Sequence, residues 1–237
     1  MRIAMWSGPR NLSTAMMYAF AARPDFAVMD EPFYAAYLAE TGLDHPMRTE
    51  ILASQPNDPN AVITELLGSI PAQKPHLYQK HMTQHMLPTI PRDWMANVTN
   101  VFLIRHPARV VASFAAKYEN PSLSDIGFVQ QAALYDDITA MGGIPIVIDS
   151  ADIRRAPETM LKRLCAAIGL EWDSNMLSWP AGGHPSDGVW AAHWYGAVHR
   201  STGFAAAEGP LPTLAAKEAA LAKAALPAYE KLAAVKL

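Results

Sequence analysis

The sequence is poor in the residues that build crosslinked or metal-clustered proteins. Its 237 residues include a single cysteine, Cys165, which excludes an internal disulfide framework and a zinc site made from cysteines. This scarcity fits a reducing cytoplasm, where we expect the protein to be found. Cys165 itself lies on the apolar face of an expected helix, and we expect it to be a packing residue.

Long apolar runs and an excess of positive charge are also missing. Only four apolar residues follow Arg2, too few for the core of a signal peptide. No later run approaches the ~20 residues that a membrane span needs. The net charge of −3 gives no sign of a nucleic-acid-binding surface. We therefore expect no membrane or nucleic-acid partner, and any anionic ligand must be held by a local site. Oligomeric state leaves no mark in the sequence.

What the sequence does contain is an alternation of strand-like and helical segments. Short apolar runs predict strands at residues 3–6, 26–29, 76–82, 98–104 and 144–148. Helical patterns follow the first strand and recur at 61–70, 109–118, 128–141, 157–168 and 214–235, the last interrupted by Pro227. Irregular structure is expected at 42–60 and 179–188. This alternation predicts a three-layer α/β/α fold with a mainly parallel central sheet, and the chain length favours one domain over residues 1–237.

The first strand ends in the turn Ser-Gly-Pro-Arg-Asn, and a helical pattern starts directly after it. Such a unit offers an anion backbone N–H groups and the positive end of a helix dipole. Arg10 adds a fixed cation, and Ser13 and Thr14 add hydroxyl groups. We interpret the stretch as a phosphate-binding loop. The alternative is an ordinary strand–helix turn in which Ser13 or Thr14 caps the helix.

This loop lacks the lysine of the Walker A pattern G-x-x-x-x-G-K-[ST]. If Gly8 is the first glycine, Thr14 stands where the lysine belongs. That lysine normally reaches the β and γ phosphates, so its absence argues against a nucleoside-triphosphate hydrolase or kinase. The segments FAVMDEP and IPIVIDS keep this alternative open, because each has the apolar-then-acidic form of a strand that binds Mg²⁺.

Charged side chains lie at, or directly after, the ends of several expected strands. They are Asp30 and Glu31, Lys80 and His81, Arg105 and His106, and Asp149 and Asp152. Ligands of parallel sheets gather at the carboxyl ends of the strands. We therefore expect these side chains and the phosphate-binding loop to converge on one rim.

With these residues, the chain resembles the sulfotransferases that use 3′-phosphoadenosine 5′-phosphosulfate. Their loop P-[KR]-S-G-[ST]-[ST] grips the 5′-phosphosulfate and is matched here by Pro9, Arg10, Ser13 and Thr14. Their R-[DH]-P motif, with a serine eight residues after the arginine, binds the 3′-phosphate and is matched by Arg105 and Ser113. The likeness is greatest to bacterial sulfotransferase-like proteins with a DEPF motif, some of whose relatives are fused to aminotransferase domains.

The resemblance implies a P-loop NTPase-like sulfotransferase fold and a reaction without a metal. A sulfuryl group would pass from 3′-phosphoadenosine 5′-phosphosulfate to a hydroxyl or amine of a small molecule. The residues implied to hold the nucleotide are Gly8, Pro9, Arg10, Asn11, Leu12, Ser13, Thr14, Arg105 and Ser113. A closing loop at 188–204 would cover the nucleotide, and Arg200 within it would add a phosphate contact.

Four residues are candidates for the chemistry itself. Arg10 and Lys80 would stabilise the negative charge that grows on the bridging oxygen. Glu31 is the first choice as general base, because it stands at a strand end beside the loop and the resemblance implies a glutamate in this region. His81 is the second choice, since an imidazole titrates near neutral pH. Glu31 would otherwise cap a helix or pair with Arg10.

The sequence departs from the family pattern at Asn11 and Leu12, which replace Ser-Gly. Because leucine disfavours the positive φ that glycine tolerates, we expect a different loop path or an unusual conformation at Asn11. A non-catalytic nucleotide-binding module of the same fold is therefore a further alternative. The acceptor pocket should be built from residues 33–37, 42–60 and 178–194, whose aromatic side chains and few charges suggest a small, partly apolar acceptor.

Overall fold

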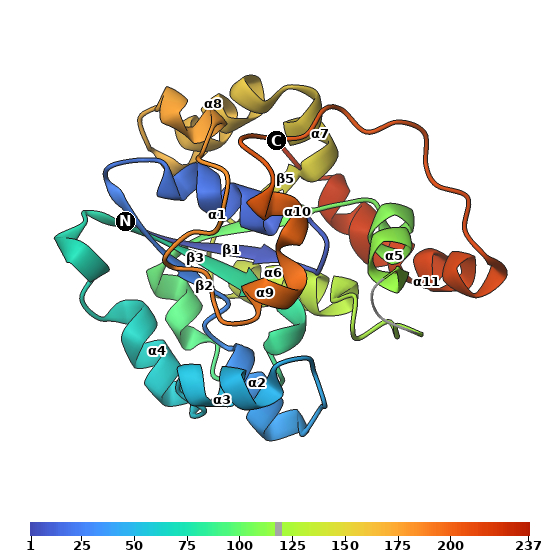
Figure 1. Ribbon diagram of the computed structural model, residues 1–237, viewed down its shortest axis with the longest axis horizontal. Helices are drawn as coiled ribbons and strands as arrows, with labels where there is room; N and C mark the ends of the chain where they lie inside the picture. Colours follow the sequence, from blue (N-terminus) through green and yellow to red (C-terminus); the bar gives the residue numbers. More distant parts are fainter. Residues whose placement is uncertain (117–119) are drawn as a thin grey trace.

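The computed structural model describes residues 1–116 and 120–237. A sheet of parallel strands forms its centre (Figure 1). The strands are β1 (Arg2–Ser7), β2 (Phe26–Asp30), β3 (His76–Met82), β4 (Thr99–Ile104) and β5 (Ile146–Asp149), in the spatial order β2-β3-β1-β4-β5. Each expected strand is present with small shifts at its ends. The prediction of a mainly parallel central sheet is confirmed.

Helices fill most of the segments between the strands. The α-helices are α1 (Ser13–Ala21), α2 (Tyr34–Thr41), α3 (Arg48–Ser54), α4 (Pro59–Leu67), α5 (Pro107–Ala115), α6 (Phe128–Ala140), α7 (Ser150–Arg155), α8 (Pro157–Ile168), α9 (Ala191–Trp194), α10 (Gly196–His199) and α11 (Ala216–Ala233). Short 3-10 turns lie at Pro71–Gln73, Thr83–His85, Asp93–Asn97 and Ser174–Leu177. The expected end of the helix that starts at Pro107, at Lys117 and Tyr118, lies outside the described residues.

Two expectations about helices are wrong. Residues 42–60 are not irregular throughout, because they contain α3 and the start of α4. Helix α3 buries only Ile51, so its sequence carries little periodicity. Helix α11 also continues through Pro227 instead of breaking there. A proline removes one N–H from the helical ladder, and the packing of α11 against α5 and α6 supports the helix around that gap.

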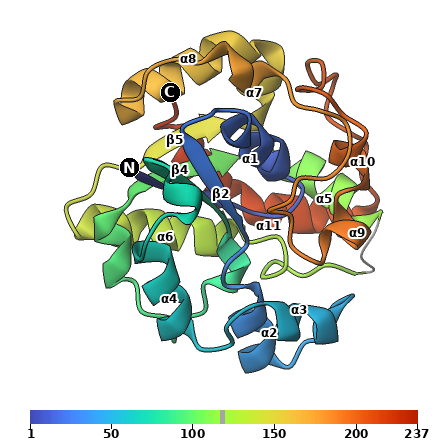
Figure 2. The ribbon, with the colours of Figure 1, turned by 60° about the vertical axis from the view of Figure 1, so that its left-hand side comes forward.

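Alternate residues along the strands divide the core into two layers, because successive side chains of a strand point to opposite faces. One core cluster, against α1 and α8, contains Ile3, Met5, Val101 and Leu103. The other, against α4 and α6, contains Ala4, Trp6, Phe102 and Ile104. Figure 2 shows α1 and α8 on one side of the sheet and α4 and α6 on the other. The fold therefore has a three-layer α/β/α arrangement.

The parallel strands bring their carboxyl ends to one side of the sheet. In Figure 1 the arrows of β1 and β3 point towards α9, α10 and α5. Each residue that follows a strand is therefore delivered to the same rim. Within the described ranges, every helix is too short or too polar to cross a lipid bilayer.

Candidate functional site

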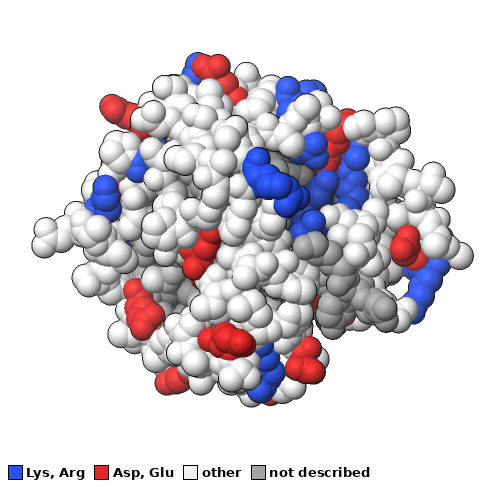
Figure 3. Space-filling model, viewed as in Figure 1, with Lys and Arg blue, Asp and Glu red and all other residues white. Residues whose placement is uncertain are grey.

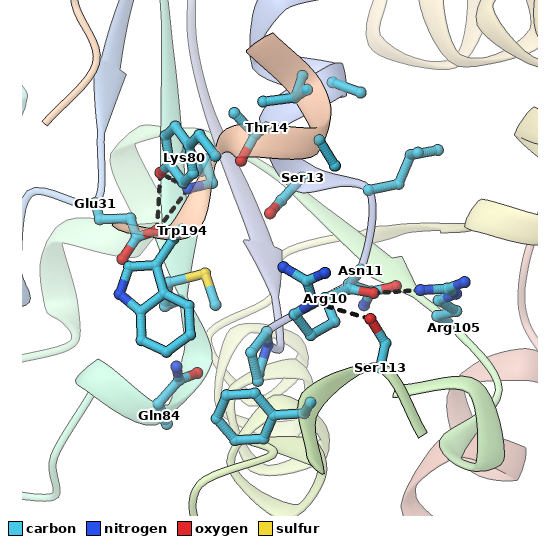
Figure 4. A pocket seen from close by; sticks show the side chains of 18 of the residues that line it. Arg10, Asn11, Ser13, Thr14, Glu31, Lys80, Gln84, Arg105, Ser113 and Trp194 are labelled. Carbon is cyan, nitrogen blue, oxygen red and sulfur yellow. Dashed lines mark hydrogen bonds and ion pairs between the residues drawn. The ribbon is translucent and has the colours of Figure 1, made fainter. Parts of the chain in front are cut away.

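A cavity of about 330 Å³ opens at the carboxyl ends of β1, β3 and β4. The expected site residues that line it are Pro9, Arg10, Asn11, Leu12, Ser13, Thr14, Glu31, Lys80, Arg105 and Ser113. They come from separate parts of the chain and face one another across the cavity (Figure 4). Its volume lies in the range of small-molecule and cofactor sites, roughly 300–1,000 Å³.

The loop between β1 and α1 contains two residues in the left-handed backbone conformation that were not expected to adopt it. Leu12 itself has a positive φ of 67°, and Arg10 has a φ of 59°. Asn11, between them, is not in the left-handed region. The expectation that leucine would avoid this conformation is therefore wrong. A left-handed residue costs roughly 1–2 kcal/mol, so the surrounding structure must hold the loop in place.

Two hydrogen bonds supply this hold. Asn11 is buried and donates from Nδ2 to the Leu103 carbonyl oxygen at 2.5 Å. Arg105 donates from Nη1 to the carbonyl oxygen of Arg10 at 2.6 Å. Both bonds fix the loop to β4 and its end. Alternation of left- and right-handed residues turns successive N–H groups towards one side, which makes a concave anion-binding backbone.

The hydroxyl groups of Ser13 and Thr14 do not cap helix α1. The N-cap residue is Leu12, which makes no side-chain cap hydrogen bond. Both hydroxyls point into the cavity (Figure 4), and among residues 1–116 and 120–237 neither has a hydrogen-bond partner. The alternative of a plain capped turn is wrong. The first turn of α1 therefore offers two hydroxyls and its unpaired N–H groups to a ligand.

Arg10, Ser113 and Arg105 form the wall of the cavity next to the loop. Arg10 donates from Nε to Oγ of Ser113, which lies on α5, at 2.9 Å. Burial lowers the pKa of the Arg10 guanidinium, and the charge of nearby Arg105 lowers it further. Since the two positive charges disfavour each other, an anion bound beside both guanidinium groups would relieve their repulsion. The structure thus brings the two halves of the expected phosphate site together.

Lys80 and Glu31 lie on the opposite wall. Nζ of Lys80 is 2.5 Å from Oε1 of Glu31 and 2.9 Å from Oδ1 of Asp30. The hydroxyl of Tyr195 donates to Asp30 at 2.9 Å and is itself bonded by Lys80. Glu31 therefore pairs with Lys80 rather than with Arg10, and Asp30 is held inside the same buried network.

The pKa values of this network move in the same direction. Burial raises the pKa of the Glu31 carboxyl, and the Lys80 charge opposes this only in part. Burial lowers the pKa of Lys80, but the charges of Asp30 and Glu31 outweigh it and raise the value. Lys80 thus stays charged, while Glu31 binds a proton more readily than an ordinary glutamate.

His81 is not brought to the cavity. It is a residue of β3 and follows Lys80, so its side chain points to the other face of the sheet. There it is buried and stacked on Trp6, with ring centroids 4.4 Å apart. Burial lowers its pKa to about 3. The second choice of base therefore does not fit the structure.

Two other expected contacts also lie away from the cavity lining. Arg200 is exposed at the end of α10. Gly8 does not face the cavity, but a Cβ atom at this position would lie 2.6 Å from the carbonyl oxygen of Ile126. The absence of a side chain at Gly8 therefore allows the loop backbone to approach the backbone of Ile126 closely.

Asp30 and Asp149, the aspartates that could bind Mg²⁺ in a nucleoside-triphosphate enzyme, both make hydrogen bonds within the protein. Asp30 bonds Lys80 and Tyr195 as described, and its Oδ2 also accepts from the Gly188 N–H. Asp149 caps α7 and accepts a hydrogen bond from the Tyr229 hydroxyl at 2.9 Å. In the part of the chain that the structure describes, no group of three or more His, Cys, Asp or Glu side chains is arranged to hold a metal ion.

Tyr34 and Trp194 line the cavity and fall within the stretches expected to build the acceptor pocket. Gln84 and His85, which line the end of the cavity beyond Glu31, were not expected there. The hydroxyl contacts of Tyr195 with Lys80 and Asp30 were not expected either. Gln84 and His85 form a 3-10 turn directly after β3, where a strand-end rule alone would have pointed to them.

Comparison with protein families gives a match over nearly the whole chain. A family described as "Sulfotransferase domain" matches residues 1–236. Two curated proteins of Arabidopsis thaliana, the branched-chain-amino-acid aminotransferase-like proteins 1 and 2, are 38% and 36% identical over 231 and 230 residues. These matches cover 97% of this chain and 41% of each relative. The chain thus spans about two-fifths of the length of the curated relatives it matches.

Solved structures show the same fold at low identity. The sulfotransferase domain from the curacin biosynthetic pathway is 16% identical, with a TM-score of 0.52 over 94% of this chain and 96% of that one. A sulfotransferase from Alicyclobacillus acidocaldarius is 12% identical, with a TM-score of 0.53 over 73% of this chain and 87% of that one. These similarities concern the arrangement of the sheet and its helices.

Proposed function

Because this chain belongs to the sulfotransferase domain family, we propose that it transfers a sulfuryl group from 3′-phosphoadenosine 5′-phosphosulfate to a hydroxyl or amine of a small molecule. The observation that carries the proposal is the cavity itself. One wall presents the anion-binding loop with Arg105 and Ser113, and the opposite wall presents Lys80 and Glu31. The proposal takes residues 1–237 as one sulfotransferase-like domain that works in the cytoplasm.

The residues present fit this nucleotide. The hydroxyls of Ser13 and Thr14 stand at a helix N-terminus without a partner among the described residues. Arg10 and Leu12 line the cavity and have left-handed backbones, which occur in loops whose N–H groups bind anions. These groups would hold the phosphosulfate end. Arg105 and Ser113 would hold the second phosphate. When bound, the nucleotide would supply the activated sulfuryl group.

The side chains of the cavity would stabilise the negative charge that develops during transfer and would remove a proton from the acceptor. Arg10 and the free hydroxyls are preorganised to stabilise negative charge as it develops at the loop. Lys80 adds a buried positive charge on the facing wall. Glu31 is placed to take a proton from the acceptor, because its raised pKa brings proton uptake closer to neutral pH.

The far end of the cavity is proposed to hold the acceptor. Tyr34, His85 and Trp194 provide ring surfaces there, and Gln84 provides an amide. Figure 4 shows Gln84 and Trp194 on the same side of the cavity as Glu31. Oε1 of Gln84 is buried and has no hydrogen-bond partner in the described residues. An acceptor with an apolar body and a hydrogen-bond donor would satisfy both features.

A second candidate function is a non-catalytic nucleotide-binding module. One observation favours it: Glu31, the proposed base, already forms an ion pair with Lys80, with Nζ and Oε1 2.5 Å apart. In such a module the loop would bind the nucleotide but Glu31 would take no proton.

A binding experiment tests the nucleotide class. Adenosine 3′,5′-bisphosphate and ATP with Mg²⁺ are compared by thermal unfolding. A ligand at 100 times its dissociation constant stabilises the fold by about 2.7 kcal/mol. We expect stabilisation by the bisphosphate. Stabilisation by ATP alone would instead favour a nucleoside-triphosphate enzyme.

Variants then assign the roles. Arg105→Ala should abolish the stabilisation, whereas Arg163→Ala, an exposed arginine on α8, should preserve it. Glu31→Gln should bind the bisphosphate normally and lose transfer to any acceptor. Full transfer by Glu31→Gln would remove Glu31 as the base. Binding without transfer by the wild-type protein, across a broad panel of alcohols, phenols and amines, would favour the non-catalytic module.

A further inference from the structure

An arginine cluster lies beside the cavity and holds a carboxylate of the same chain. The cluster consists of Arg105 at the end of β4, Arg109 on α5 and Arg154 on α7. All three contact Glu208, whose side chain is only 4% exposed. Figure 3 shows basic side chains gathered between α10 and α5, with acidic atoms beside them. Arg105 belongs to both features, since it also lines the cavity.

The carboxylate of Glu208 is an uneven fit to this cluster. Its Oε1 accepts from Nε of Arg105 at 3.1 Å, from Nη2 of Arg105, and from Nη1 of Arg154 at 2.7 Å. Its Oε2 lies 3.0 Å from Nε of Arg109 but accepts no hydrogen bond from the described residues. One oxygen is therefore crowded with donors while the other lacks one.

A phosphate monoester matches the cluster better than a carboxylate does. Three guanidinium groups face a single negative charge, which leaves two positive charges unbalanced. A phosphate monoester carries about −1.5 to −2 charge at pH 7 and three acceptor oxygens. Arginine forks bind such oxygens in pairs. The cluster thus has the charge and the donors for a phosphate.

Glu208 lies on a segment that little else holds. Residues 204–215 connect Gly203 to α11 without helix or strand (Figure 1). Phe204 packs against Trp179, with ring centroids 5.2 Å apart, and Leu214 packs in the core cluster of α5 and α11. The residues between these two ends, 205–212, are here called the strap. Arg154 donates to the Ala206 carbonyl oxygen at 2.9 Å, and Arg109 donates to that of Gly209. In the described part of the chain, every hydrogen bond and ion pair of residues 205–212 is made with the arginine cluster.

We propose that the arginine cluster binds a phosphate group of the nucleotide, and that Glu208 fills this place in the free protein and is displaced when the phosphate binds. Displacement removes the main anchor of the strap, so ligand binding releases residues 205–212. The identity of the nucleotide rests on the proposed function. The exchange itself concerns any phosphate that reaches the three arginines.

The test uses Glu208→Gln, which keeps the shape of the side chain and removes its charge. Glu158→Gln, at an exposed glutamate paired with Lys162 on α8, is the matched control. Inorganic phosphate and adenosine 3′,5′-bisphosphate are titrated calorimetrically into the full chain. We expect Glu208→Gln to bind both at least tenfold more tightly than wild type and Glu158→Gln to match wild type. Equal or weaker binding by Glu208→Gln would show Glu208 to be a permanent counter-ion and overturn the proposal.

Limited proteolysis of the strap gives a second readout. Elastase cleaves an accessible chain after small residues such as Ala205, Ala206 and Ala207. In the wild-type protein, saturating phosphate should speed cleavage within residues 205–212. In Glu208→Gln, cleavage there should already be fast and should respond little to phosphate. Slower cleavage of the wild-type strap on binding would mean that the ligand closes the strap, which contradicts displacement.

The outcomes separate this proposal from the proposed function. Phosphate binding with strap release, but no binding of the bisphosphate by either protein, supports the exchange and refutes the nucleotide assignment. Bisphosphate binding that is insensitive to Glu208→Gln supports the nucleotide assignment and refutes the exchange. Failure of both probes to bind either protein refutes both.

Discussion

Lys80 and Glu31 form an ion pair on the cavity wall opposite the phosphate-binding loop, with Nζ of the lysine 2.5 Å from Oε1 of the glutamate. Both side chains are buried, and Asp30 shares the lysine at 2.9 Å. The lysine is therefore the counter-charge for two carboxylates that water barely reaches. This arrangement ties the stability of the site to one ammonium group.

Replacing Lys80 by methionine should destabilise the fold strongly. The change leaves Asp30 and Glu31 buried without their cation, and breaking a buried ion pair from one side costs about 3–5 kcal/mol. Urea unfolding would measure the loss. Lys231→Met, which removes an exposed ion pair with Asp136, should cost less than about 1 kcal/mol. Equal effects of the two changes would contradict the role given to Lys80.

Leu12→Gly and Leu12→Ala form a matched pair that isolates the backbone of the loop. Both remove the leucine side chain, but only glycine adopts the φ of 67° without strain. The glycine variant should therefore be more stable than the alanine variant by about 1 kcal/mol. Thermal or denaturant unfolding of both proteins decides the point. An alanine variant of equal or higher stability would show that the loop leaves this conformation freely.

Gly8→Ala should weaken both the fold and nucleotide binding. Its new Cβ would lie 2.6 Å from the Ile126 carbonyl oxygen, so the loop must shift. Overpacking of this kind costs roughly 1–3 kcal/mol. Gly209→Ala is the control for stability, because a Cβ there meets no atom within 4 Å. Arg163→Ala, on the exposed face of α8, is the control for binding, because Gly209 lies in the strap. Unfolding curves and bisphosphate titrations provide the measurement, and an unchanged Gly8→Ala protein would contradict the close approach.

His81 should make the protein sensitive to acid. Burial lowers its folded-state pKa to about 3, whereas an unfolded histidine has a pKa of about 6.5. Between these values the unfolded chain binds a proton that the folded chain rejects, so the free energy of unfolding falls as the pH falls. His81→Phe removes this proton uptake and should reduce the slope by up to about 1.4 kcal/mol per pH unit.

Urea unfolding of wild type and His81→Phe from pH 7 down to pH 4 gives the two slopes. The curves should run parallel above about pH 7, where an unfolded histidine is neutral. An identical slope below pH 6 would mean that His81 gains a proton in the folded state.

The sequence was sufficient for the sheet and for one wall of the cavity. Short apolar runs marked the strands, and the rule that ligands meet parallel strands at their carboxyl ends brought Arg10 and Arg105 together. Ser113, inside α5, was named only because the resemblance to the sulfotransferases implied it. The same rule erred at His81, because β3 continues to Met82 and adjacent residues of a strand face opposite ways. Because Lys80 and His81 are neighbours on β3, only one of their side chains can face the cavity, and it is that of Lys80.

Other features depend on contacts that no local pattern records. Leu12 adopts a left-handed conformation because Asn11 and Arg105 bond the loop from outside it. Glu208 is an isolated acidic residue in a stretch of alanine, glycine and proline, yet it lies among three arginines from distant segments. Long-range partners of this kind become visible only when the strands are placed side by side.

The strand order has a consequence for how such a cavity can be altered. Strand β1 pairs with β3 on one side and with β4 on the other. Glu31 and Lys80 come from the β2–β3 side, whereas Arg105, Ser113 and the arginine cluster come from the β4–β5 side. The two groups are joined by the central strand β1 and by a shared core cluster, in which Val62 and Trp94 pack with Phe102. Changes confined to the cavity-facing side chains of the β2–β3 side can therefore alter the acceptor half while β1 and β4 keep the pairing that holds the anion-binding half.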